Sequence, residues 1–155
     1  MFEHVQSAYR IARSTLDPLM RIVADVNNGS NQSPFHQTLA KKLGLTSAFN
    51  KVDHGYLLDI MDDIKIPPCF GKFYKGFLSD QRFRVKFNNA VSKSAKESCG
   101  SPQGIVSSPW LFLIYMEAML RKIVPIATLH NIKMGMFADN LTPWTTGRNL
   151  PRLEK

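Results

Sequence analysis

The segment Pro109–Leu120 does more than any other to limit how this chain can fold. Its residues are apolar or aromatic except for Glu117. A helix that spans a membrane needs about 20 consecutive apolar residues, so this segment is too short to cross a bilayer. It is better explained as the buried part of a long helix, which we expect over residues 105–123. The apolar content of 44% agrees with a globular chain that has a core.

A β-hairpin is expected on the N-terminal side of this helix. Residues 82–87 alternate between cationic and apolar side chains, the pattern of a half-buried strand. The Asn-Asn pair at 88–89 suits a tight turn, and residues 90–97 would form the partner strand.

A second hairpin is expected on the C-terminal side of the long helix. Its strands would be residues 132–137 and 141–145, with Asp139 and Asn140 at the tip. A short strand is also expected around residues 38–45.

Apolar residues recur at helical spacing in three further segments, residues 16–26, 54–61 and 68–78. Ser14 and Thr15 can cap the first of these helices, and the Pro-Pro pair at 67–68 can end the second and start the third. Helices before and between antiparallel hairpins predict an α+β fold, with helices packed on one face of an antiparallel sheet.

The charge balance and the cysteines suggest a partner and a compartment. A formal net charge of +8 and a pI near 9.7 favour an anionic partner, with nucleic acid as the leading candidate. A basic surface without a specific partner explains the charge about as well. Cys69 and Cys99 have neither metal-ligand spacing nor a disulfide framework, so we expect free thiols in a reducing compartment. The N-terminus lacks the apolar core of a secretory signal, which predicts an intracellular protein, nuclear or cytoplasmic.

Three blocks of sequence carry the most specific signal. Residues 98–109 have the sequence Ser-Cys-Gly-Ser-Pro-Gln-Gly-Ile-Val-Ser-Ser-Pro, residues 137–141 have Phe-Ala-Asp-Asn-Leu, and residues 45–54 have Leu-Thr-Ser-Ala-Phe-Asn-Lys-Val-Asp-His. In order and spacing these blocks resemble the palm of reverse transcriptases, most closely those of non-LTR (LINE-type) retrotransposons. The Arg-Ser-Thr run at 13–15 and the segment 70–87 also resemble parts of these enzymes.

The resemblance extends over nearly the whole chain. It implies a partial reverse transcriptase domain over residues 1–148, comprising the end of the fingers and a polymerase palm, followed by a C-terminal tail at 149–155. A thumb is not expected in a chain of 155 residues, so the domain is expected to be truncated.

The resemblance also implies a catalytic site that holds Mg²⁺. Nucleotidyl transfer uses two divalent cations held by hard oxygen ligands, chiefly aspartates from separated strands. Gly44 stands where the family has its first aspartate, and the third block has Asp139 followed by Asn140 in place of two adjacent aspartates. Only Asp139 remains as a catalytic and metal-binding carboxylate, with Gly44 and Asn140 as degenerate partners.

Two other positions of the first block bear on the metal. Asn50 replaces the second acid of the block, and Asp53 is kept. In the family the residue at Asp53 lies past the turn and is not a ligand, so we do not expect it to substitute for Gly44. We therefore expect weak Mg²⁺ binding at Asp139 and a loss of RNA-directed DNA polymerase activity, that is, a pseudoenzyme.

The other site positions match the family better. The resemblance places Phe49 against the sugar of the incoming nucleotide, where the alternative is a phenylalanine of the core. It places Gln103 and Gly104 against nucleotide and template, and Ala138 beside the catalytic carboxylate in the same nucleotide-binding group. Gly100 and Gly104 would let the backbone approach a nucleic acid closely.

Three functions remain open at this point. The leading one is a reverse transcriptase palm of retrotransposon origin that is inactive as a catalyst. The second is a nucleic-acid-binding module without chemistry, whose partner is RNA or DNA, and the third is a relic product without selected function. Cations and aromatic residues interleave over residues 72–87, which suits a nucleic-acid track and is equally well explained by an aromatic core with solvated cations.

Overall fold

A computed structural model describes residues 4–97, 99–101 and 104–148 of the chain. It divides into two compact units, unit 1 (residues 1–46 and 117–155) and unit 2 (residues 47–116). Helices and antiparallel sheets both occur, so the expected α+β class is confirmed.

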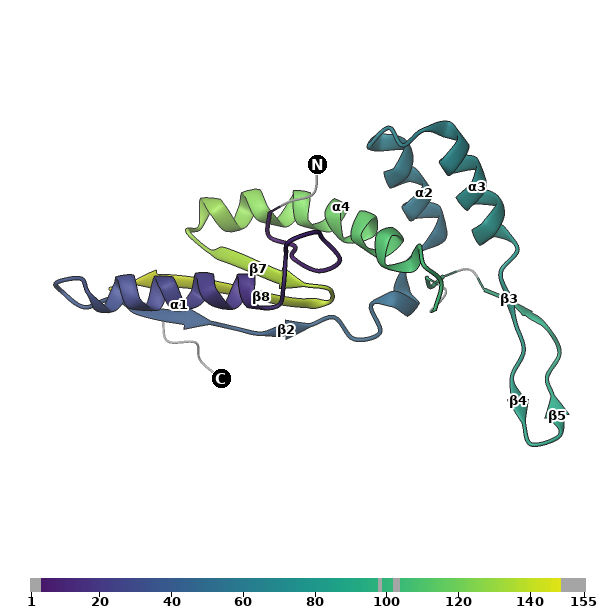
Figure 1. Ribbon diagram of the computed structural model, residues 1–155, viewed down its shortest axis with the longest axis horizontal. Coiled ribbons are helices and arrows are strands. Elements are labelled where there is room, and N and C mark those ends of the chain that lie inside the picture. Colours follow the sequence, from purple (N-terminus) through teal and green to yellow (C-terminus); the bar gives the residue numbers. More distant parts are fainter. Residues whose placement is uncertain (1–3, 98, 102–103, 149–155) are drawn as a thin grey trace. The chain divides into compact units, whose positions relative to one another are not determined.

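The sheet of unit 1 is built around one long strand, β8 (Asn140–Gly147). β7 (Lys133–Phe137) forms an antiparallel hairpin with β8, as expected for the second hairpin. On its other side β8 pairs with β1 (Gln37–Ala40) and with β2 (Leu43–Gly44), both antiparallel. The short strand expected around residues 38–45 is therefore two strands, which meet successive parts of β8 (Figure 1).

Helix α1 (Leu16–Ser30) lies against β1, β7 and β8. It begins where expected, and the Ser14 Oγ accepts a hydrogen bond from the Leu16 N–H at 3.2 Å. The close approach depends on Gly135 in β7, because a Cβ there would lie 2.5 Å from the Cβ of Pro18. No side chain can occupy that space, so glycine at this position sets the distance between helix and sheet.

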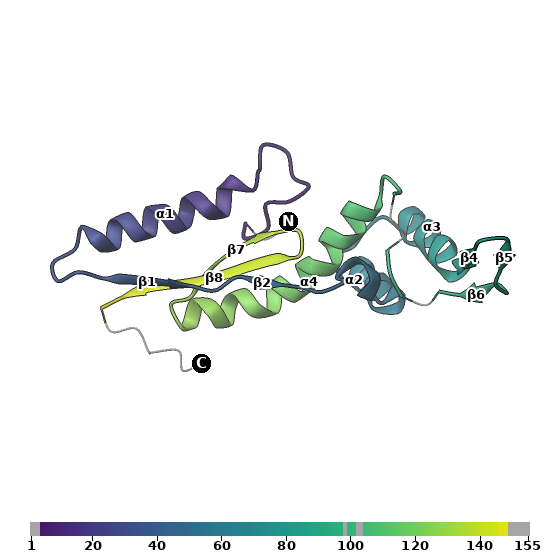
Figure 2. The ribbon, with the colours of Figure 1, turned by 90° about the horizontal axis from the view of Figure 1, so that it is seen from below.

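Both faces of β7 are covered. The three successive residues Met134–Met136 are buried, and successive side chains of a strand point to opposite faces. α1 covers the face of Gly135, and in Figure 2 the C-terminal part of α4 (Ser108–Leu129) lies on the other side of the strands from α1. Met134 and Met136 project from one face of β7, and Gly135 lies on the face that α1 covers.

The outer edge of β7 is occupied by the N-terminal segment. The Ser7 N–H donates to the Met136 carbonyl and the Met136 N–H donates to the Val5 carbonyl, each at 2.9 Å. This short parallel bridge satisfies backbone groups that would otherwise lie open at the edge of the sheet.

Unit 2 contains a short 3-10 helix, η1 (Phe49–Lys51), and two helices, α2 (His54–Asp63) and α3 (Pro68–Ser79). α2 and α3 pack against each other, and α3 starts at the expected proline. The unit also contains the first hairpin, as four two-residue strands: β3 (Arg82–Phe83), β4 (Lys86–Phe87), β5 (Ala90–Val91) and β6 (Ala95–Lys96).

The first hairpin is less regular than the alternating sequence predicts. β3 pairs with β6 and β4 pairs with β5, so the turn at residues 88–89 is where it was expected. The ladder is interrupted at residues 84–85, where the Val85 N–H donates to the Ser92 Oγ at 2.9 Å. A side-chain acceptor replaces a ladder partner there, and the two expected long strands are divided into short pieces.

Helix α4 is the long helix expected from the apolar segment. It begins at Ser108, later than predicted, and continues to Leu129 with Pro125 inside it. The Ser101 Oγ donates to the Ser108 Oγ at 3.0 Å, which ties the preceding loop to its start. Among the described residues, no helix combines the length and the apolar character needed to cross a membrane.

Candidate functional site

The third block forms the turn of the β7–β8 hairpin in unit 1. Phe137 pairs with Asn140, so the two residues of the turn are Ala138 and Asp139. Asn140 was expected at the tip, and it instead opens strand β8. Ala138 has a φ of 54°, a left-handed conformation that is uncommon for a residue with a side chain.

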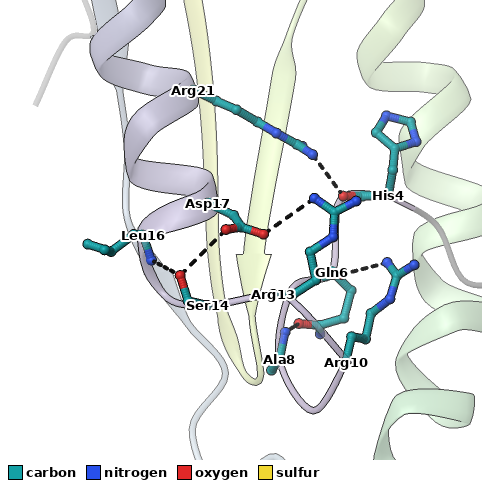
Figure 3. A network of polar contacts seen from close by, with 9 residues as sticks. All are labelled: His4, Gln6, Ala8, Arg10, Arg13, Ser14, Leu16, Asp17 and Arg21. Atoms are coloured by element: carbon teal, nitrogen blue, oxygen red, sulfur yellow. Dashed lines mark hydrogen bonds and ion pairs between the residues drawn. The ribbon is translucent and has the colours of Figure 1, made fainter.

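Gln6 holds this turn in place, and no sequence pattern points to it. Its side-chain amide donates to the Ala138 carbonyl and accepts from the Ala138 N–H, both at 3.1 Å. The same Oε1 accepts from the Ala8 N–H at 2.9 Å, and the Gln6 carbonyl accepts from the Arg10 guanidinium at 2.9 Å (Figure 3). Gln6 is 2% exposed. The buried amide thus satisfies both polar backbone groups of Ala138, which stabilises the conformation beside Asp139.

Gly44 lies directly across the sheet from the third block. Its Cα is the register partner of Asn140, and the next residue, Leu45, donates its N–H to the Asp139 carbonyl at 3.1 Å. The expected convergence of the first and third blocks on adjacent strands is therefore present. A Cβ built on Gly44 would meet no atom within 4 Å. The space beside Gly44 is therefore open, and the aspartate that the resemblance implies at this position would fit there.

Asp139 supplies the carboxylate in the turn of the β7–β8 hairpin. It is half-buried, and its Oδ1 accepts a hydrogen bond from the Asn140 amide at 3.2 Å. Asn140 offers a neutral carbonyl oxygen and Gly44 offers no side-chain ligand. Among the described residues, no group of three or more His, Cys, Asp or Glu side chains is placed to hold a metal ion. The part of the chain that the structure describes therefore does not form the carboxylate cluster that two Mg²⁺ ions require.

In unit 2, hydrogen bonds join the end of the first block to the start of the second block. The Phe49 carbonyl accepts from the Ser101 N–H at 2.8 Å, and the Val52 carbonyl accepts from the Gly100 N–H at 2.7 Å. The His54 Nε2 lies 2.7 Å from the Gly100 carbonyl oxygen, which can only accept, so this nitrogen carries the proton. These hydrogen bonds join two segments that lie about fifty residues apart in the sequence.

Phe49 and Asp53 both have structural partners. The Phe49 ring stacks on the ring of buried Phe112, with centroids 4.2 Å apart and planes 16° apart. This stack alone accounts for an aromatic residue at position 49, and contact with a nucleotide stays a prediction. The Asp53 Oδ1 accepts from the Tyr56 N–H at 2.7 Å and so caps α2. The retained acid of the first block therefore has a capping role.

The glycines of the second block adopt backbone conformations that favour glycine. Gly100 has a φ of 104° and is buried, whereas Gly104 has a φ of 88° and is exposed, and a Cβ at Gly104 would meet no atom within 4 Å. The expected contact of Gly104 with nucleotide and template stays a prediction. Gln103 lies outside the described residues, and its role stays a prediction.

A model of the family described as reverse transcriptase (RNA-dependent DNA polymerase) matches residues 1–150. The chain belongs to this family. The match covers both the hairpin of unit 1 and the joined blocks of unit 2, so the resemblance seen in the sequence blocks is confirmed.

Two relatives from Drosophila melanogaster place this reverse transcriptase sequence among those of non-LTR transposons. It is 30% identical over 141 residues to a probable RNA-directed DNA polymerase from transposon X-element. It is 24% identical over 110 residues to a probable RNA-directed DNA polymerase from transposon BS. These alignments cover 90% and 71% of this chain, and 15% and 12% of the two relatives. The chain therefore corresponds to a small part of each relative's length.

Proposed function

We propose that this chain is a reverse transcriptase palm of retrotransposon origin that no longer catalyses DNA synthesis. The observation that supports this most directly is Gly44, which lies opposite Asn140 and beside the turn of Asp139. The strands that would bring three carboxylates together are paired, and two of the three carboxylates are missing from them.

The missing carboxylates matter because of the charge that the reaction develops. Two divalent cations neutralise the attacking oxygen and the leaving phosphate in this type of transfer. Asp139 supplies one negative charge, and the Asn140 amide supplies a dipole in place of a second. One carboxylate and one amide are too few hard ligands to hold Mg²⁺ tightly.

The scaffold of the site is better preserved than its chemistry. In unit 1 the turn at Ala138 is held by Gln6, and in unit 2 the backbone bonds of Gly100 and Ser101 join the first and second blocks. These contacts use backbone and neutral side-chain groups, so they do not depend on a metal. Loss of the acids therefore leaves the fold intact and removes the capacity to bind the cofactor.

A magnesium titration followed by NMR tests the metal part of this proposal. We expect the backbone amide of Asp139 to shift only weakly, at millimolar Mg²⁺. The double variant Gly44→Asp/Asn140→Asp restores the family's acids into open space at position 44 and is expected to bind Mg²⁺ more tightly. Saturation of the unaltered chain at micromolar Mg²⁺ would contradict the proposal.

The catalytic part is tested by exchange into an active relative. Residues 4–148 replace the corresponding segment of an active non-LTR reverse transcriptase, once unaltered and once with the double variant, and primer extension on an RNA template is measured. We expect extension only from the chimaera that carries both aspartates. Extension by the unaltered chimaera would show that Gly44 and Asn140 do not abolish catalysis.

A second candidate function is nucleic-acid binding without chemistry. It is favoured by the net charge of +8 and by the exposure of the cations and phenylalanines in residues 82–96. The partner would be RNA or DNA. Binding of RNA that weakens steeply with salt, compared with an unrelated protein of equal charge, tests this candidate.

A further inference from the structure

We propose that residues 82–96, here called the basic ribbon, bind single-stranded nucleic acid by stacking Phe83 and Phe87 on bases while the neighbouring cations contact phosphates. This inference rests on the second candidate function and names the surface that performs it. The basic ribbon carries strands β3 to β6 and follows α3 (Figure 1).

Exposure is the first observation that supports this assignment. Every residue from 82 to 96 is exposed, and Phe83 and Phe87 are 49% and 76% exposed. An aromatic core with solvated cations would instead bury these rings. An isolated two-stranded ribbon is marginally stable in water, so large apolar rings without cover are a cost to the free protein. A partner that covers the rings would remove that cost.

The residues that pair with the two rings across the ladder leave space for a bound ligand. Phe83 pairs with Ala95, and Phe87 pairs with Ala90. Paired residues project from the same face of a ladder, and alanine is too small to cover an aromatic ring. Each ring therefore has an open face, which is the arrangement that base stacking uses.

The charges of the basic ribbon point to a polyanion. It contains five cations and no Asp or Glu: Arg82, Arg84, Lys86, Lys93 and Lys96. Arg82 and Lys96 are directly opposite each other in the ladder, and like charges in this position repel. An exposed ion pair of Arg82 with Asp80, at 3.5 Å, offsets little of this repulsion. A phosphate bound between Arg82 and Lys96 would attract both side chains and so offset their mutual repulsion.

A single strand fits these features better than a membrane does. Insertion into a lipid surface needs a continuous apolar face. Phe83, Val85 and Phe87 alternate with the cations, but the ladder that would hold these apolar residues on one face is interrupted between β3 and β4. Aromatic rings that alternate with cations supply both contacts that a single strand uses, which are stacking surfaces for bases and positive charge for phosphates.

The test measures fluorescence anisotropy of labelled 20-nucleotide oligouridine RNA and oligothymidine DNA with the full 155-residue chain, in EDTA. Phe83→Ala/Phe87→Ala is expected to raise both Kd values about ten-fold or more, because each stacked base contributes substantially to affinity. The control Phe35→Ala removes a ring that is 58% exposed in unit 1 and should leave Kd unchanged. Equal losses in the two variants would overturn the proposal.

The cations are tested through the salt dependence. Arg84→Gln/Lys86→Gln should lower the slope of log Kd against log salt by about 1.4, since each phosphate contact on a single strand contributes about 0.7. Lys41→Gln/Lys42→Gln makes the same change in net charge on unit 1 and should leave the slope unchanged. An unchanged slope in the basic-ribbon variant would exclude phosphate contacts there.

Two further arms decide between ligand classes. Tighter binding of RNA than DNA assigns the natural ligand to RNA through its 2′-hydroxyls, and equal binding assigns the site to single strands of either kind. Equal binding of duplex and single strands, or binding of phosphatidylserine vesicles without binding of oligonucleotides, would overturn the proposal. Because EDTA removes Mg²⁺, failure here is distinguishable from failure of the metal titration, which tests the inactive-palm proposal.

Discussion

The β7–β8 hairpin and the basic ribbon are both antiparallel and both belong to the same small chain, yet they are stabilised in different ways. β7 is buried at three successive residues and β8 is anchored by Trp144, which is 2% exposed. In the basic ribbon no residue is buried or half-buried. The hairpin is thus part of a core, whereas the basic ribbon is exposed to solvent at every residue.

This difference indicates two separate causes for the presence of a hairpin, which are packing in a core and the proposed contact with a ligand. β8 pairs with both β7 and β2 with Gly44 and Asn140 in the ladders, because packing on α1 does not require acids at these two positions. The basic ribbon has no packing of that kind, and its alternation of cations and rings agrees instead with the proposed contact with a nucleic acid. The proposed loss of catalysis is therefore compatible with a preserved core and with the proposed binding surface.

The largest test of the comparison removes one aromatic side chain from each region. Trp144→Ala should lower the free energy of unfolding by about 3–5 kcal/mol, because it leaves a cavity in the core. Phe87→Ala, at a ring 76% exposed, should change it by less than about 0.5 kcal/mol. Urea unfolding followed by circular dichroism measures both. Similar losses in the two variants would mean that the basic ribbon is packed in solution.

A smaller effect is expected from adding one methyl group. Gly135→Ala places a Cβ 2.5 Å from the Pro18 Cβ and should cost about 1–3 kcal/mol, because helix and strand must move apart. In unit 2, Gly76 of α3 has no atom within 4 Å of such a Cβ. Gly76→Ala should therefore stabilise the helix by about 0.5–1 kcal/mol. Thermal unfolding should give opposite signs, and equal signs would contradict the packing of α1 on β7.

An ion pair in each region gives the next effect. Burial raises the pKa of the Asp25 carboxyl, but hydrogen bonds from Lys133 and Trp144, both at 2.7 Å, outweigh burial and lower this pKa below 3.8. Asp25 therefore contributes stability above about pH 3.8, and this contribution is lost as pH falls through the lower folded-state pKa.

Replacement of the Asp25 carboxylate measures that contribution. Asp25→Asn should cost about 1–2 kcal/mol at pH 7, and its difference from the unaltered chain should shrink in acid below the pKa of the folded carboxyl. Asp80→Asn removes the exposed partner of Arg82 and should have no measurable effect at either pH. A pH-independent cost at Asp25 would show that the carboxylate charge is not the stabilising feature.

The smallest effect concerns the restored acids. In EDTA, Gly44→Asp/Asn140→Asp should be less stable than the unaltered chain by about 0.5–1 kcal/mol, because carboxylates crowded near Asp139 repel each other. Added Mg²⁺ should reverse the difference. The single change Gly44→Ala is the control for altered strand propensity. A loss in EDTA that equals that of Gly44→Ala would exclude repulsion as its cause.

The sequence predicted those parts of the fold that depend on local patterns. The apolar run indicated α4, the proline pair indicated the start of α3, and the third block indicated the β7–β8 hairpin. The interruption of the first hairpin was not predicted, because a hydroxyl group of Ser92 replaces a ladder partner. The alternation of cationic and apolar side chains indicates which residues favour a strand, but it does not indicate where the hydrogen bonds between two strands are interrupted.

The candidate site was predictable only where the family supplied a motif. The pairing of Gly44 with the third block followed from the resemblance, whereas the capping role of Asp53 was not predicted. Gln6 could not be found in this way, because a single amide in the N-terminal segment has no pattern around it. Its role depends on a contact with Ala138, a residue 132 positions away.

The separation of Gln6 and Ala138 in the sequence has a consequence for the order in which the chain folds. The turn at Ala138 is held by the side-chain amide of Gln6. This contact can therefore form only after the β7–β8 hairpin has been synthesised. Contacts between such distant residues close long loops, which slows folding relative to local structure. During synthesis on the ribosome, Gln6 would leave the exit tunnel long before its partner existed. The buried amide would then be one of the last groups to lose its bound water as the domain closes.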